Sequence, residues 1–86
     1  FTVNDTTPSV AGANIFVIPA SWSLGNNITA LDDGVEGQVV VVICLSENCS
    51  MVSGGNLILS STFSGINKVI TLVYYNSNWY EIARKV

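Results

Sequence analysis

The chain has 86 residues, of which 49% are hydrophobic and only 10% are charged, whereas about a quarter of a typical globular domain is charged. It contains no histidine, and three basic residues stand against six acidic ones, which gives a net charge of −3. The lack of histidine removes the commonest acid–base catalyst and metal ligand. The few cations argue against partners such as nucleic acid or an anionic membrane surface. The longest apolar run, residues 39–45, is far shorter than the roughly 18 residues of a membrane helix, so no membrane insertion is expected.

The hydrophobic content is high for so short a chain. A domain of this length buries only about 60% of its extended surface when it folds alone. Many Val, Ile and Leu side chains would then stay in water. We therefore expect other copies of the chain to cover them. Because the sequence begins with Phe1, we also expect a fragment or a processed product.

Short apolar runs rich in β-branched residues alternate with clusters of Gly, Asn, Asp and Ser, which predicts an all-β protein. Residues 1–13 are predicted to be an irregular lead-in or a linker, and residues 14–86 a single β domain. The predicted strands, in chain order, are residues 14–18, 27–31, 38–45, 49–52, 56–60 (extended past a bend by 61–63), 68–75 and 78–85.

Two of these strands carry further predictions. Residues 39–43 are consecutive β-branched residues, which indicates a strand covered on both faces. Residues 68–75 and 78–85 are separated by Asn76 and Ser77, which suit a two-residue hairpin turn.

Cys44 and Cys49 are the only cysteines. Their spacing suits a disulfide across the neck of a short hairpin, with two buried free thiols as the alternative. Two thiols without a histidine cannot complete a zinc site, so no metal and no cofactor are expected.

Asp32, Asp33 and Glu36 form the only acidic cluster. Paired carboxylates can cleave a glycosidic bond, and several can hold Ca²⁺. However, Asp32-Asp33-Gly34 is also a typical turn, and we favour that interpretation. Because no serine or cysteine has a histidine to activate it, we expect no enzyme activity.

Trp22 lies in a predicted loop and is the candidate for an exposed receptor or glycan contact. Trp79 and Tyr80 would point to opposite faces of one strand, so at most one of them can lie on a binding surface. For these two residues, packing is the preferred interpretation.

Four sequence segments together carry a resemblance: residues 34–38 (GVEGQ) before an apolar strand, 55–59 (GNLIL), 70–75 (ITLVYY) and 78–84 (NWYEIAR). In this order they resemble a module at the C-terminal end of bacteriophage tailspike and tail-fibre proteins and related exported bacterial proteins. The two cysteines and the Trp22 segment are not part of that pattern.

The resemblance implies a homotrimer in which short strands from three chains wrap one axis as an intertwined β-helix or β-prism. It also implies a structural role in the virion, outside the cell: trimerising and capping a tail spike or fibre. The alternatives are a small monomeric β-sandwich and, in function, a tip domain that binds a host-surface glycan or protein. The residues predicted for the trimer interface are Val39, Val41, Ile43, Leu57, Leu59, Ile70 and Leu72. A slip of one residue would move such a set to the opposite face of the sheet.

Overall fold

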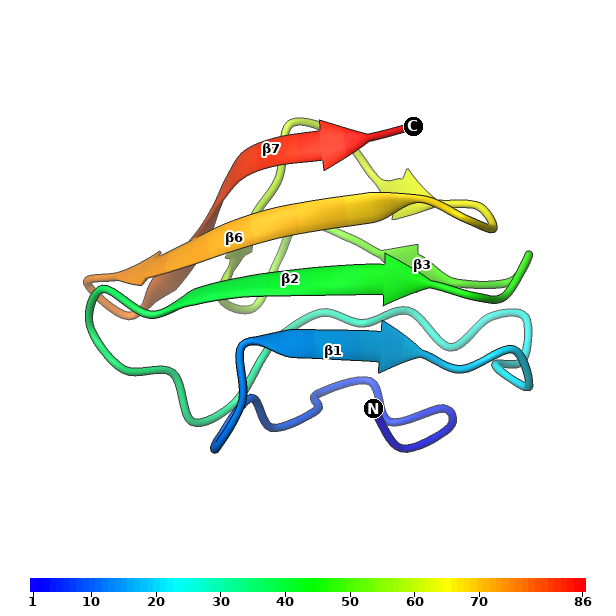
Figure 1. Ribbon diagram of the computed structural model, residues 1–86, viewed down its shortest axis with the longest axis horizontal. Coiled ribbons are helices and arrows are strands. Elements are labelled where there is room, and N and C mark those ends of the chain that lie inside the picture. The colour runs from blue at the N-terminus through cyan, green and yellow to red at the C-terminus, as the bar shows by residue number, and fades with distance from the viewer.

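The computed structural model describes all of residues 1–86 and contains seven strands and no helix (Figure 1). The chain is therefore all-β, as the sequence predicts. The strands are β1 (Ile15–Ile18), β2 (Val39–Cys44), β3 (Ser50–Met51), β4 (Leu57–Ile58), β5 (Phe63–Ser64), β6 (Val69–Tyr75) and β7 (Asn78–Lys85).

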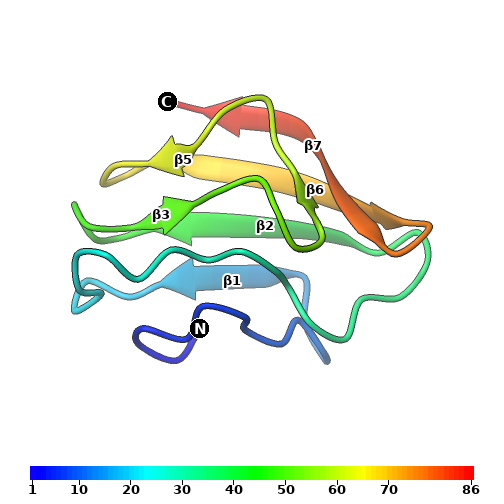
Figure 2. The ribbon, with the colours of Figure 1, turned by 180° about the vertical axis from the view of Figure 1, so that it is seen from behind.

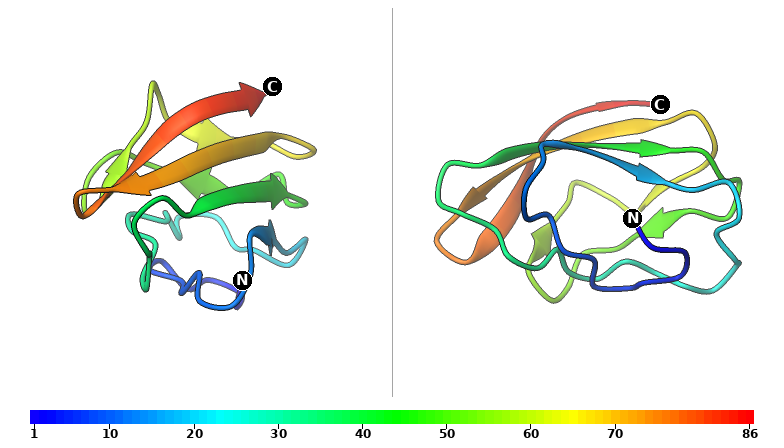
Figure 3. Two further views of the ribbon diagram at one scale, coloured as in Figure 1. Left: turned by 60° about the vertical axis from the view of Figure 1, so that its left-hand side comes forward. Right: turned by 60° about the horizontal axis from the view of Figure 1, so that its bottom comes forward.

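Five strands form one mixed sheet in the order β1-β2-β6-β7-β4, and β3 pairs with β5 in a small second sheet. β1 runs parallel to β2, β4 runs parallel to β7, and the remaining pairs in the large sheet are antiparallel. The small sheet and the long irregular segments lie behind the large sheet (Figure 2). Figure 3 shows the same two layers from two further sides.

The β6–β7 hairpin is confirmed. Its turn residues, Asn76 and Ser77, have φ angles of 50° and 69°. Two consecutive positive φ angles fit the type I′ turn, whose twist matches that of the flanking strands. The register shifts between Thr71 and Leu72, because a β-bulge places the extra residue Ile82 on β7.

β2 alternates in burial, so within one chain only one face of residues 39–43 is covered. Coverage of the second face by another copy stays a prediction. Val40, Val42 and Cys44 are fully buried, whereas Val39 is exposed and the other odd-numbered positions are half-buried. The β-branched run therefore marks a strand, and a single chain supplies the cover for one of its two faces.

Residues 27–31 do not form the predicted strand; only Ile28 makes an isolated bridge to Met51. A side-chain amide takes the place of a neighbouring strand here. Asn56 Oδ1 accepts the N–H of Leu31 at 3.0 Å, and Asn56 Nδ2 donates to the Leu31 carbonyl at 2.9 Å. These two bonds satisfy the backbone of a buried residue without a ladder.

The predicted strands at 49–52 and 56–60 shorten to β3 and β4, two residues each. The segment at 61–63 does not extend β4. Instead β5 pairs with β3, in the register Met51 to Phe63, in the second sheet. The short strands thus build the layer that covers the core.

Residues 1–13 are irregular, as expected, but they are not a linker. Val10 is fully buried, and its N–H donates to the Asp32 carbonyl at 2.9 Å. The Phe1 ring stacks on Phe16 with centroids 5.0 Å apart. This segment is part of the folded unit, which therefore begins before residue 14.

The core is a single cluster of fifteen buried hydrophobic residues. Its largest members are Trp22, Trp79 and Phe63. The Trp79 indole donates to the Leu31 carbonyl at 3.1 Å and lies against the Tyr74 ring, with centroids 4.9 Å apart. One chain thus closes a core of its own.

Candidate functional site

The large sheet has one face without any covering segment, which we call the outer face. No loop or strand crosses this side in Figure 1, whereas the opposite side carries β3, β5 and the irregular segments in Figure 2. Residues on the covered side, such as Val40, Val42, Ile70 and Leu72, are fully buried. Strand alternation therefore assigns their neighbours to the outer face.

The strand registers show how the outer face is arranged. Val41 lies between Ile15 of β1 and Thr71 of β6, and Thr71 in turn pairs with Ala83 of β7. The rows on either side continue the same pattern. The outer face comprises Ile15, Val17, Val39, Val41, Ile43, Ile58, Val69, Thr71, Val73, Tyr80, Ile82 and Ala83.

The outer face is apolar and carries almost no charge. Apart from Thr71 and Tyr80, its side chains are aliphatic. Lys85, the partner of Val69, stands at one corner, and none of the six acidic residues belongs to the face. Large exposed apolar patches on a folded protein mark interaction surfaces.

The size of the outer face is compatible with a specific interface. Five strands about 4.8 Å apart, with a rise of about 3.3 Å per residue, give a footprint of roughly 400 to 500 Å². Two such faces together bury on the order of 1,000 Å², which reaches the lower bound for a specific protein–protein interface.

The seven predicted interface residues divide between the two sides of the sheet. Val39, Val41 and Ile43 lie on the outer face. Leu57, Ile70 and Leu72 are buried in the core of this chain, so assigning them to an interface is wrong. Leu59 is half-buried and packs against the core.

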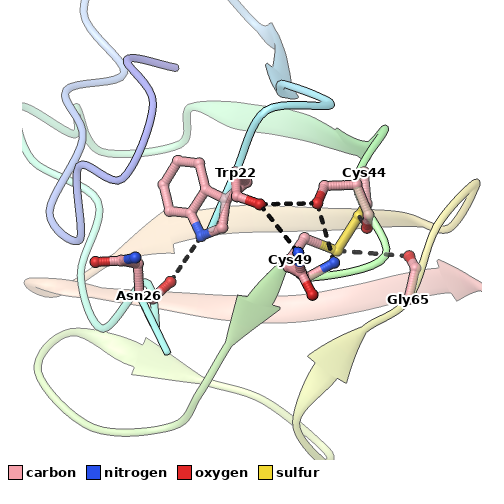
Figure 4. Close-up of a disulfide and its surroundings, with 7 residues drawn as sticks. Trp22, Asn26, Cys44, Cys49 and Gly65 are labelled. Carbon is pink, nitrogen blue, oxygen red and sulfur yellow. Dashed lines mark hydrogen bonds between the residues drawn. A yellow bond between two sulfur atoms is a disulfide. The ribbon is translucent and has the colours of Figure 1, made fainter. Parts of the chain in front are cut away.

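Trp22 is not an exposed contact, so the structure overturns that prediction. Its side chain is only 1% exposed, and its indole donates to the Asn26 carbonyl at 2.7 Å (Figure 4). The Trp22 carbonyl accepts the hydroxyl of the buried Ser46 at 3.2 Å. The loop thus folds back around the Trp22 indole.

Cys44 and Cys49 form the disulfide that their spacing suggests. It does not close a hairpin, because β3 pairs with β5 and not with β2. Instead it joins the end of the large sheet to the start of the second layer, next to the Trp22 loop (Figure 4). Both cysteines are buried members of the core cluster.

Reducing this disulfide is expected to lower the free energy of unfolding by about 2 kcal/mol, since the closed loop is short. Urea unfolding with and without reductant measures the difference. A Cys44→Ala/Cys49→Ala variant is the control, because its unfolding midpoint should not respond to reductant. An unchanged wild-type midpoint, with reduction verified by mass, would contradict a stabilising role.

Two acidic residues in the segment 32–36 bond to distant parts of the chain. The Asp33 carboxylate accepts a hydrogen bond from the Ser9 hydroxyl, and Glu36 Oε1 accepts the N–H of Asn76 at 2.7 Å. Gly34 fits beneath two rings, since a Cβ there would lie 2.6 Å from Tyr74. Asp33 and Glu36 also line an open groove of about 560 Å³. Asp33 lies at a bend with a φ of 67°, and the hydrogen-bonded turn lies further along the chain than predicted, where the Gln38 N–H donates to the Val35 carbonyl at 2.8 Å.

Glu81 and Arg84 make the only ion pair in the structure, with Arg84 Nε 2.7 Å from Glu81 Oε2. The guanidinium also donates to the Ser61 carbonyl at 2.9 Å and lies over the Phe63 ring. Hydrogen bonding to Arg84 lowers the pKa of Glu81 to about 2. The pair ties β7 to the segment that leads into β5.

Because the pKa of Glu81 is lowered in the folded protein, the free energy of unfolding is expected to fall at acidic pH. The stability from the ionised carboxylate is present above its unfolded-state pKa and is lost as the pH falls from about 4.5 toward 2. Between about pH 6 and about pH 2.5 the wild type should lose on the order of 1 to 2 kcal/mol more than Glu81→Gln. Urea titrations at both pH values test this, and equal losses would contradict it.

No family model, curated protein or solved structure matches the chain. No three His, Cys, Asp or Glu side chains gather as a potential metal site. None of its segments forms an apolar helix of membrane-spanning length.

Proposed function

We propose that the protein is a structural trimerisation and capping module at the distal end of a phage tail spike or fibre, without catalysis of its own. The observation that carries this proposal is the outer face, an uncovered apolar sheet surface without acidic residues. The resemblance of the sequence to tailspike modules supports the viral setting, outside the cell, and a trimer in preference to other assemblies.

In the proposed trimer each protomer keeps its own core, and three sheets turn their outer faces toward a common axis as the sides of a prism. Each 100 Å² of apolar surface removed from water contributes about 2.5 kcal/mol. The net charge of −3 per chain would oppose association, but the acidic groups all lie off this face. Two outer faces can therefore meet without bringing acidic groups together, and the contact buries apolar surface.

The first test is the absolute mass of the purified chain, measured by light scattering on a sizing column. We expect about three times 9.2 kDa. A dilution series distinguishes a stable trimer from a weak one. A mass of one chain at every concentration would refute the proposal, and a dimer would refute the threefold arrangement.

The alternative, a tip that binds a host receptor or glycan, loses the residue that suggested it because Trp22 is buried. The open groove between residues 11–14 and 33–38 is one of the places left for a polar ligand, and it contains no aromatic ring for sugar stacking. A second groove is lined by Phe1 and Phe16, whose rings stack on each other. No groove repeats the exposed tryptophan on which the alternative rested. Trimerisation is therefore the better supported function.

A further inference from the structure

The outer face ends at two edges, one at β1 and one at β4 and β7. The β4–β7 edge carries a groove. β4 pairs with β7 over only two residues, Leu57 to Trp79 and Ile58 to Tyr80, and then diverges. Beyond this point β7 has no neighbour in the sheet on that side. The space between them, which we call the edge groove, has a volume of about 350 Å³. The apolar residues lining it are Ile58, Leu59, Tyr80, Ile82 and Ala83.

The edge groove continues the outer face, since Ile58, Tyr80 and Ala83 belong to both. Its one charged group is already engaged. Glu81 is paired with Arg84, and its Oε1 accepts the N–H of Ser60 at 3.0 Å. The edge groove therefore favours an uncharged, apolar occupant.

The opposite edge of the sheet carries a projection that fits this description. Ile15, the first residue of β1, is 65% exposed and lies in the same row of the outer face as Val41. Residues 11–18 around it contain no charged side chain. The two edges thus present an apolar knob and an apolar groove.

We propose that Ile15 of one copy inserts into the edge groove of the next copy, and that three such contacts close the ring. This inference rests on the proposed trimer. When three sheets stand around an axis parallel to their strands, the β1 edge of each meets the β4–β7 edge of its neighbour. A contact between two different patches is heterologous, and it forms a closed ring when the rotation permits.

The test is an Ile15→Cys/Ile58→Cys double variant, oxidised after purification and run on a non-reducing denaturing gel. Within one chain the two sites lie on edge strands separated by three others, about 19 Å across the sheet. That distance exceeds the Cα separation of about 7 Å that a disulfide allows. Any bridge is therefore between copies, and the native cysteines are already paired. We expect a covalent trimer as the end product.

Three control variants show whether cross-linking requires this pair of positions. Each single-cysteine variant should form no covalent trimer, and neither should Ile15→Cys/Val35→Cys, because Val35 is exposed in the turn at residues 34–38. Light scattering of the reduced double variant separates the two proposals. A trimer without cross-links overturns the knob-and-groove contact and leaves the proposed function standing, whereas a wild-type monomer overturns both. A product that stops at the dimer, or one that extends beyond three chains, overturns the closed ring.

Discussion

Replacing Val41 with Asp is expected to convert the proposed trimer of about three times 9.2 kDa into monomers. Val41 lies near the centre of the outer face, between Ile15 and Thr71. Three carboxylates brought to one apolar axis would be desolvated without partners, which costs several kcal/mol for each buried charge. Light scattering at a fixed protein concentration measures the change in mass.

The Val41→Asp result needs a matched substitution and a check of folding. Val35→Asp introduces the same charge at a valine that is 67% exposed outside the sheet, and it should leave the trimer intact. Val41 is half-buried on its own strand, so the protomer should keep its fold, with a loss of about 1 kcal/mol from strand propensity. Circular dichroism verifies this. A folded Val41→Asp trimer would contradict the placement of the interface.

The sequence predicts the long strands well because their signals are local. The hairpin needs only two apolar runs and the pair Asn76-Ser77, which adopt the positive φ angles of its turn. β2 needs only its β-branched run. The missing strand at 27–31 reflects contacts with several distant segments. Ile28 bonds to the backbone of residues 50 and 52, and Thr29 bonds to Thr6. Asn56, 25 positions from Leu31, supplies the hydrogen bonds of the Leu31 backbone.

The interface prediction failed in part because it depended on register. Along β2 the odd-numbered residues lie on the outer face, and Val41 pairs with Thr71. The outer residues of β6 are therefore also odd-numbered. The two predicted residues of β6, Ile70 and Leu72, are even-numbered and point into the core. The sequence of one strand does not show whether the odd-numbered or the even-numbered residues of the neighbouring strand lie on the same face. That relation is fixed by the hydrogen-bond register and by which face the irregular segments cover.

The burial of Trp22 also depends on contacts that are distant in the sequence. Its loop is rich in Ser, Gly and Asn, which indicates a surface segment. What the local sequence does not show is that Ser46 and Asn48, from the loop after β2, both bond to the Trp22 carbonyl and hold the loop inward. The burial of this indole is a tertiary property, and the disulfide next to it belongs to the same arrangement.

Trp22→Ala is accordingly expected to act on folding and not on recognition. Removing a buried tryptophan costs about 3 to 5 kcal/mol through lost apolar contacts and the cavity left behind. Here it also removes the 2.7 Å hydrogen bond to the Asn26 carbonyl. Since small domains are stable by only about 5 to 15 kcal/mol, this is a large share of the total. Urea unfolding at one protein concentration, followed by the fluorescence of Trp79, measures the loss.

Leu24→Ala is the matched control, because Leu24 lies in the same loop and is 82% exposed. It should change the free energy of unfolding by no more than about 0.5 kcal/mol. If Trp22→Ala were as stable as Leu24→Ala, the indole would not be a core residue. The hypothesis that Trp22 contacts a receptor would then be supported again. A loss of host-cell binding in Trp22→Ala can therefore be interpreted only together with the unfolding curve of the same variant. A destabilised loop and a lost ligand contact both reduce binding, and only the first shifts the unfolding midpoint.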